Sequence, residues 1–225
     1  MKQLLKGVVK FKHDVFPSQQ VKFEGLASSQ SPRILFITCS DSRIDPSLIT
    51  QTSPGELFIC RNAGNIVPPH EKNSGGTVAS IEFAVAALGV KDIVVCGHTD
   101  CGAIKGAMNP EALSTLPHVS DWLAHTEGAV ATVKARRGDL TAENLAEVTR
   151  ENVVLQLRHL MTHPAVLAAT ARGQAQLHGW VYDIGHGDIK CYDWRDDLWH
   201  SVDDVYNNPE LIARIEKGQS NHHHA

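Results

Sequence analysis

The sequence predicts an α/β fold, with a mostly parallel central β-sheet flanked by helices, an N-terminal helical arm and an antiparallel edge strand near the C-terminus. Short apolar runs of strand length alternate with segments of helical periodicity in the first half of the chain, which is typical of parallel sheets covered on both faces. A hairpin pattern occurs only late, around residue 185. The length of 225 residues fits one large domain with a full hydrophobic core.

The N-terminal half supplies the predicted parallel strands. Apolar residues recur with helical spacing up to about residue 30, with an interruption near Pro17, which predicts an arm of one or two helices. Two short continuous apolar runs, residues 33–38 and 56–60, are expected to be buried parallel strands. Residues 77–88 are expected to be helical, and a third buried strand is expected over residues 91–98.

The C-terminal half is predicted to be mainly helical until the hairpin. A helix is expected to start around Cys101, and the apolar pattern indicates helix throughout residues 117–172. Two β-rich runs flank the turn sequence GHGD at residues 185–188, and residues 203–217 are expected to form a closing helix. We therefore expect a single domain over residues 1–225, made of the arm (1–30), a core with the candidate metal ligands (31–110), and a remainder with the helical segment, hairpin and last helix (111–225).

Charge and composition limit the possible partners. The 21 lysines and arginines are scattered and the formal net charge is −4, whereas nucleic acids and anionic membranes are bound by concentrated basic surfaces. The N-terminus lacks the apolar core of a signal peptide, and no run of about 18 apolar residues occurs, so we expect a cytoplasmic protein without a spanning helix. Small molecules or copies of the chain are the expected partners. Five cysteines in such a chain indicate metal ligation or burial rather than disulfides, and the terminal NHHHA is a tag remnant or a natural tail.

Two motifs with reactive side chains follow directly after predicted strands. The sequence CSDSR, residues 39–43, comes after the first strand, and GHTDC, residues 97–101, comes after the third. In open parallel sheets, ligands gather at the carboxyl ends of the strands. Both motifs are therefore expected on the same rim of the sheet.

The thiols and the imidazole of these motifs form a candidate metal site. His98 and Cys101 are three residues apart and can turn toward one point from a tight bend, although such a pair alone is a weak signal, and a surface histidine beside a buried thiol is the alternative. With Cys39 on the same rim, the set becomes two thiolates and one imidazole, which leaves the fourth position of a catalytic zinc site open. The other three thiols lie in strand runs or in the hairpin and are expected to be structural: Cys60, Cys96 and Cys191.

Asp41 and Arg43 lie beside the candidate ligands. An exposed ion pair of this kind contributes about 0–1 kcal/mol, and a solvated pair without function is one interpretation. Because the pair lies next to a candidate metal ligand, two other interpretations are possible. The Asp41 carboxylate can fill the open zinc position, or Arg43 can hold it back in a charge-assisted pair, from which it accepts a hydrogen bond from zinc-bound hydroxide.

Five blocks extend the two motifs over most of the chain: SPRILFITCSDSR, PGELFICRNAGNIVPP, GGTVASIEFAVAALGVKDIVVCGHTDCGAIKG, RENVVLQL and LHGWVYDI. In this order they resemble the β-class carbonic anhydrases. The resemblance implies reversible hydration of carbon dioxide to bicarbonate and a proton at a zinc ion held by Cys39, His98 and Cys101, by a zinc-bound hydroxide that the Asp41–Arg43 dyad orients. It also implies a homodimer or a dimer-based tetramer in which the N-terminal helices reach over a neighbour.

Further positions of the family match one by one. Gln30 matches a glutamine that hydrogen-bonds substrate across the dimer interface, and Gly102 matches a glycine whose backbone N–H faces the substrate. Phe58, Ala63 and Phe83 fall at positions of a small apolar pocket, and Phe83 replaces a tyrosine often found there. An apolar pocket suits carbon dioxide, which has no charge to recognise; on residue type alone, plain core packing is an equal alternative.

The family has two subtypes, which differ in how the aspartate is controlled. In one, bicarbonate binds a separate pocket formed by a tryptophan, an arginine and a tyrosine, and the aspartate moves onto zinc. Arg61 and Tyr182 match that pocket, but Phe36 stands at the tryptophan position. The resemblance therefore favours the subtype in which the Asp41–Arg43 pair stays intact.

Other functions are compatible with parts of this pattern. Carbonyl sulfide and carbon disulfide hydrolases use the same fold and zinc ligands. A non-catalytic zinc-bearing scaffold or bicarbonate sensor is a second alternative, although a structural zinc site has no use for a carboxylate held back by an arginine. A thiol phosphatase is disfavoured because the five residues from Cys39 to Arg43 are too short for a glycine-rich anion loop.

Overall fold

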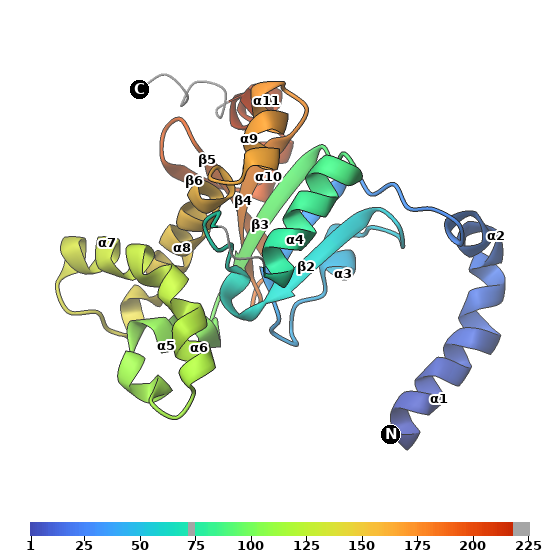
Figure 1. Cartoon of the computed structure of the whole chain (residues 1–225), viewed down its shortest axis with the longest axis horizontal. Coiled ribbons are helices and arrows are strands. Elements are labelled where there is room, and N and C mark those ends of the chain that lie inside the picture. The colour runs from blue at the N-terminus through green and yellow to red at the C-terminus, as the bar shows by residue number, and fades with distance from the viewer. Residues whose placement is uncertain (72–74, 218–225) are drawn as a thin grey trace. The chain divides into compact units, whose positions relative to one another are not determined.

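The computed structural model describes residues 1–71 and 75–217 and contains a six-stranded sheet in the order β2-β1-β3-β4-β5-β6 (Figure 1). The first four strands in this order pair in parallel, and β5 and β6 are added antiparallel at the other edge. The predicted fold class is confirmed. The strands are β1 (Ile34–Cys39), β2 (Leu57–Asn62), β3 (Asp92–His98), β4 (Gln176–Asp183), β5 (Asp188–Asp193) and β6 (Leu198–Ser201).

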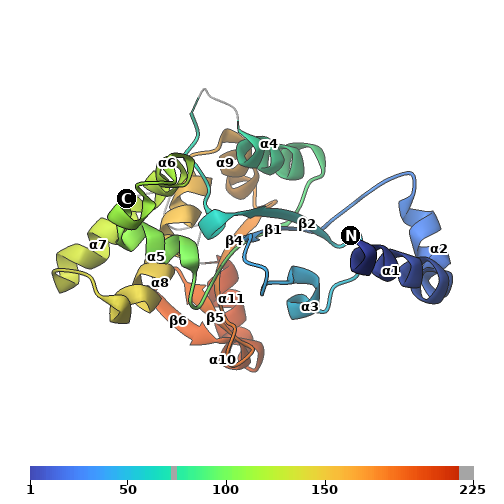
Figure 2. The ribbon, with the colours of Figure 1, turned by 90° about the horizontal axis from the view of Figure 1, so that it is seen from below.

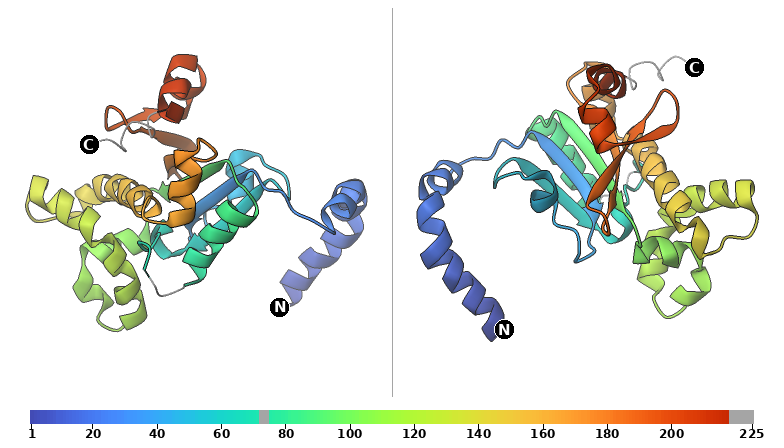
Figure 3. Two further views of the ribbon diagram at one scale, coloured as in Figure 1. Left: turned by 45° about the horizontal axis from the view of Figure 1, so that its top comes forward. Right: turned by 180° about the vertical axis from the view of Figure 1, so that it is seen from behind.

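Helices cover both faces of the sheet. Helices α4, α8 and α9 lie on one face, and α3, α10 and α11 lie on the other (Figures 2 and 3). The α-helices that follow residue 31 are α3 (Pro46–Thr50), α4 (Gly76–Glu82), α5 (Gly102–Met108), α6 (Pro117–Leu123), α7 (Glu127–Arg137), α8 (Leu145–Leu160), α9 (Pro164–Ala171), α10 (Val202–Tyr206) and α11 (Pro209–Lys217).

The central strands are buried on both sides, as their continuous apolar sequences predict. Successive side chains of a strand point to opposite faces of the sheet. In β1, Leu35 and Ile37 join the large core cluster under α8 and α9, while Phe36 packs on the opposite face with Val94 and Cys96 of β3. The strand ends of β1 and β3 are thus fixed by packing from both sides.

Side chains of helix α8 pack directly against the backbone of β3 and β4 at two strand residues that have no side chain. A Cβ atom on Gly179 would lie 2.8 Å from Leu157 Cδ1 and 3.1 Å from Val153 Cγ1, and one on Gly97 would lie 2.9 Å from Val153 Cγ2. These distances are shorter than normal van der Waals contacts, so both glycines are required for this packing.

The N-terminal unit, Met1–Ser31, is helical as predicted. It consists of α1 (Lys2–Lys10), a π-helical turn (Phe11–Val15) and α2 (Phe16–Leu26). Pro17 lies in the first turn of α2, where a missing N–H is tolerated, so the proline marks a helix start. None of the helices in the described residues has the length and apolar character needed to cross a bilayer.

Several element boundaries differ from the prediction. The helical region 117–172 is divided, since α7 ends at Arg137 and the next residue, Gly138, has a φ of 81°. The closing helix over 203–217 is two helices, because Pro209 starts α11 after a break at Asn207. Strand β6, with four residues and mixed exposure, gave no sequence signal. The tail NHHHA and residues 72–74, which precede the helix predicted over residues 77–88, lie outside the described part.

Candidate metal centre

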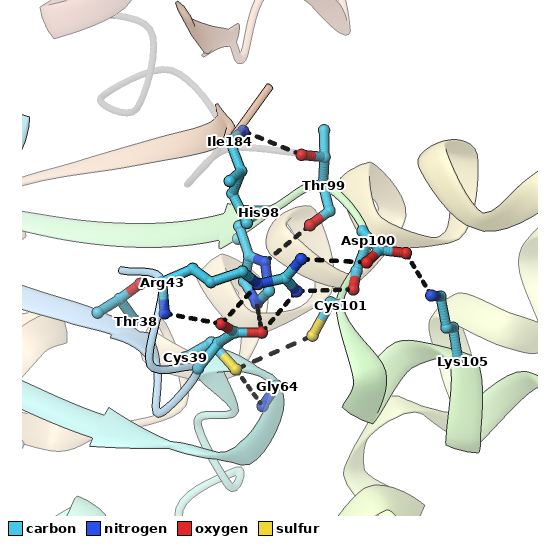
Figure 4. Close-up of polar contacts among 12 residues, drawn as sticks. Thr38, Cys39, Arg43, Gly64, His98, Thr99, Asp100, Cys101, Lys105 and Ile184 are labelled. Atoms are coloured by element: carbon cyan, nitrogen blue, oxygen red, sulfur yellow. Dashed lines mark hydrogen bonds and ion pairs between the residues drawn. The ribbon is translucent and has the colours of Figure 1, made fainter. Parts of the chain in front are cut away.

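The two motifs meet at one rim of the sheet, as predicted. Cys39 is the last residue of β1 and His98 the last of β3, and the two strands are paired in parallel, with Thr38 opposite Cys96. Cys101 follows directly after the two-residue turn at the end of β3 and is the last residue before α5. Figure 4 shows the three side chains converging from these two segments.

The three predicted ligands form a compact buried group. The sulfur atoms of Cys39 and Cys101 are 3.9 Å apart, and these atoms and a ring nitrogen of His98 all lie within 4.8 Å of one another. All three residues are at most 5% exposed. Among residues 1–71 and 75–217, this is the one cluster of three or more histidine, cysteine or acidic side chains with this spacing.

The orientation of His98 fits a metal ligand. Its Nδ1–H donates a hydrogen bond to the carbonyl oxygen of Thr99 at 2.8 Å, which leaves Nε2 with a lone pair. Nε2 is buried without a hydrogen-bond partner, which is costly for a polar atom unless something binds it. One imidazole and two thiols are a donor set that zinc prefers.

Hydrogen bonds favour the ionised form of one of the two thiols, that of Cys39. Hydrogen bonds from the Cys101 thiol and from the Gly64 N–H, which lies 3.4 Å from Cys39 Sγ, outweigh burial and lower the pKa of Cys39. The neighbouring Cys39 sulfur, followed by burial, raises the pKa of Cys101. The metal-free pair therefore holds a proton, and metal binding must release it, because thiolates are the metal-binding form.

Asp41 is held beside this group by Arg43. The guanidinium donates from Nε to Asp41 Oδ1 at 2.9 Å and from Nη2 to Oδ2 at 2.8 Å, and the Arg43 backbone N–H also donates to Oδ1. These bonds hold the pKa of Asp41 well below its usual range, so the carboxylate is charged. Its Oδ2 is 3.9 Å from His98 Nε2, beside the predicted metal position.

Two residues organise the loop after β1 through contacts that the sequence did not predict, although Arg61 matches the anion pocket of one subtype. Arg61 of β2 donates to the carbonyl oxygens of Cys39, at 3.0 Å, and Asp41, at 2.7 Å. Asp100 accepts a hydrogen bond from Arg43 Nη1 at 3.1 Å. The only signal for Asp100 was its place between His98 and Cys101, which does not reveal that it contacts the other motif.

Helix α8 fixes the loop that supplies the Gly64 N–H. Asn152, which is 1% exposed, donates to the Gly64 carbonyl oxygen at 3.1 Å and accepts from Gln156 at 2.8 Å. Gln156 in turn accepts from the backbone N–H of Val67 at 2.9 Å. Gly64 itself has a φ of 80°, a conformation that favours glycine. The hydrogen bond to Cys39 thus depends on a buried polar network.

The predicted pocket residues fall at different places. Ala63 follows β2 directly and Gly102 follows Cys101, so both lie at the rim. The rings of Phe58 and Phe83 are 6.0 Å apart, but Phe58 is four residues before the rim end of β2, about 13 Å along the strand. Gln30 is exposed within the N-terminal unit.

Comparison with known proteins gives a consistent result. The family model described as carbonic anhydrase matches residues 34–189. A carbonic anhydrase of Pseudomonas aeruginosa is 48% identical over 193 residues, which cover 86% of this chain and 88% of that protein. A carbonic anhydrase of Synechocystis is 47% identical over 195 residues, which cover 86% of this chain and 71% of that protein.

Solved structures agree with the sequence comparison. The structure of the β-carbonic anhydrase CcaA superimposes with a TM-score of 0.86 at 45% identity, covering 89% of this chain and 91% of that one. A β-carbonic anhydrase of Sordaria macrospora, described as tetrameric, gives a TM-score of 0.76 at 33% identity, covering 84% of this chain and 95% of that one.

Proposed function

This chain belongs to the β-class carbonic anhydrases, and on that premise we propose that it hydrates carbon dioxide reversibly at a zinc ion bound by Cys39, His98 and Cys101. The observation that carries the proposal is the buried, unpartnered Nε2 of His98 facing two thiols, beside a carboxylate held by an arginine. A bound zinc ion supplies a hydroxide nucleophile near neutral pH, because it lowers the pKa of the water that it coordinates.

The protein side chains have separate roles in this proposal. Cys39, His98 and Cys101 would hold the metal. Asp41, kept in its charged form by Arg43, accepts a hydrogen bond and so orients the attacking oxygen toward the substrate carbon. The positions of Ala63 and Gly102 at the rim support their contact with carbon dioxide or bicarbonate.

The remaining pocket residues support a site shared between two copies of the chain. Phe58 lies on β2, an edge strand of the sheet, and Phe83 is the first residue of the π-helical turn Phe83–Ala87 that continues α4. Their rings are neighbours, and Phe83 is 47% exposed. Within one chain they lie apart from the metal ligands. We propose that a homodimer, alone or within a tetramer, brings these phenylalanines and Gln30 to the partner's site.

The zinc-loaded wild-type protein tests this function directly. We expect about one zinc ion per chain by plasma mass spectrometry, and carbon dioxide hydration far above the buffer rate in a stopped-flow assay with a pH indicator. A zinc-loaded protein no faster than buffer would contradict the enzymatic function and favour a non-catalytic zinc protein. Faster turnover of carbonyl sulfide or carbon disulfide than of carbon dioxide would change the assigned substrate.

The state of the Asp41–Arg43 pair supports the subtype without bicarbonate control. The pair is closed by two side-chain hydrogen bonds, and Arg61 donates to backbone carbonyls of the same loop. Phe36 packs edge-to-face against Trp180 and has no hydrogen-bond donor to offer an anion. We expect bicarbonate to inhibit hydration, if at all, with a hyperbolic concentration dependence. A sigmoidal inhibition curve at constant ionic strength would show that the pocket works despite Phe36.

A further inference from the structure

Arg43 is held by two carboxylates on two different loops (Figure 4). Its Nε and Nη2 face Asp41, in the loop after β1, whereas Nη1 donates to Asp100 Oδ2 at 3.1 Å, in the loop after β3. Nη2 also donates to the backbone carbonyl oxygen of Asp100 at 3.2 Å. Asp100 therefore accepts hydrogen bonds from N–H groups of the guanidinium that do not bind Asp41.

Asp100 is itself fixed in place. Its second carboxylate oxygen, Oδ1, pairs with the ammonium group of Lys105 on α5. Its backbone has a φ of 60°, in the left-handed region, between the two predicted ligands His98 and Cys101. The four side chains form a row across both loops in the order Asp41, Arg43, Asp100 and Lys105.

The charges in this row are balanced. Asp100 alone would compete with Asp41 for the positive charge of Arg43. Lys105 compensates the charge of Asp100, so the attraction between Arg43 and Asp41 is retained while Arg43 loses rotational freedom. A planar guanidinium with five fixed donors can satisfy both carboxylates at once, which an ammonium group cannot do in this geometry.

We propose that Asp100, anchored by Lys105, is a positioning residue that keeps Arg43 on Asp41 and thereby keeps Asp41 available for the proposed hydration reaction instead of the open metal position. This role rests on the proposed function, but its structural part does not depend on turnover. Asp100 touches neither the predicted metal position nor the substrate; it acts through Arg43.

The opening of the Arg43–Asp41 pair can be measured by the hydrogen exchange of the Arg43 Nε–H, which donates to Asp41 Oδ1. In the zinc-loaded protein, this exchange rate, read from ¹H–¹⁵N NMR spectra, is proportional to the population in which the pair is open. Asp100 and Lys105 are half exposed, so their contact with Arg43 is in the range of surface ion pairs. We expect Asp100→Ala to accelerate the exchange by up to about fivefold, which corresponds to about 1 kcal/mol.

Two further variants separate the possible causes. Asp100→Asn keeps an oxygen acceptor for Nη1 but removes the charge, and we expect a smaller acceleration than in Asp100→Ala. Glu147→Gln removes a comparable surface pair, in which Arg137 Nε lies 2.9 Å from Glu147 Oε2 between α7 and α8. This control is expected to leave the exchange of Arg43 unchanged. The melting temperatures of all three variants show whether the exchange reflects local opening or global unfolding.

Each outcome decides the inference. An unchanged exchange rate in Asp100→Ala overturns it, and a slower rate shows that Asp100 competes with Asp41 for Arg43 instead of holding it. Acceleration in Glu147→Gln as well assigns the effect to a general loss of stability. If the wild-type protein does not hydrate carbon dioxide but Asp100→Ala accelerates the exchange, the proposed function fails while the positioning of Arg43 stands.

Discussion

Replacing Cys39 with serine is expected to remove both the metal and the activity. A serine hydroxyl does not ionise near neutral pH, whereas hydrogen bonds from Cys101 and from the Gly64 N–H stabilise the Cys39 thiolate. Changes in residues that merely support metal ligands often reduce affinity or activity by about 10–100-fold, so loss of a ligand should exceed about 100-fold. Zinc content and stopped-flow hydration rates measure both effects in the same preparation.

Cys96 provides a matched control for this substitution. It is also fully buried at the same end of the sheet, but burial raises its pKa to about 12 and its thiol donates to the Gly97 carbonyl oxygen, a bond that a serine can also make. Cys96→Ser should keep the zinc and most of the activity. If Cys39→Ser retained a full complement of zinc, or if Cys96→Ser lost it, the proposed ligand set would be wrong.

The second large effect is expected for Asp41→Asn, which should keep the metal but slow the reaction. Asp41 is bound to Arg43 in the structure, so its charge is not required to hold the ligands together. An asparagine side chain cannot carry the negative charge that Arg43 stabilises, and its amide no longer presents two acceptor oxygens. Side chains that accept protons or orient reacting groups commonly increase the reaction rate by about 10²–10⁴-fold. We expect Asp41→Asn to lower the rate of carbon dioxide hydration by at least about 100-fold at neutral pH.

Asp45→Asn is the matched control in the same loop. Asp45 caps α3 by accepting a hydrogen bond from the Leu48 N–H at 3.2 Å, and asparagine is an equally good helix cap. Its zinc content and hydration rate should equal those of the wild type. Asp41→Asn with unchanged kinetics would exclude the carboxylate from the mechanism. Loss of zinc in this variant would instead give Asp41 a role in holding the metal.

The parallel strands and the rim position of the three candidate metal ligands could be predicted because both depend on local sequence patterns. A continuous apolar run defines a buried strand, and the residues that follow it are placed at the carboxyl edge by topology alone. Cys39, His98 and Cys101 therefore came together as expected, although Cys39 and Cys101 are 62 positions apart.

Contacts that depend on tertiary geometry could not be predicted. Asp100 reaches Arg43 across two loops, and Asn152 reaches Gly64 from a helix 88 positions later in the chain. Neither pair has a characteristic spacing. Strand β6 was missed because four residues at a sheet edge carry too little periodicity, and the break before α11 depends on a single proline.

The two glycines beneath α8 limit which sequences can support the metal centre. Gly97 and Gly179 contact neither the predicted metal position nor Asp41, yet a methyl group at either one would push Val153 and the helix away from the sheet. The same helix carries Asn152, which positions the Gly64 N–H against the Cys39 sulfur. Substitutions at Gly97 and Gly179 would therefore disturb the hydrogen bond from Gly64 to the Cys39 sulfur through α8. These two glycines are constrained by that hydrogen bond although neither of them contacts the sulfur.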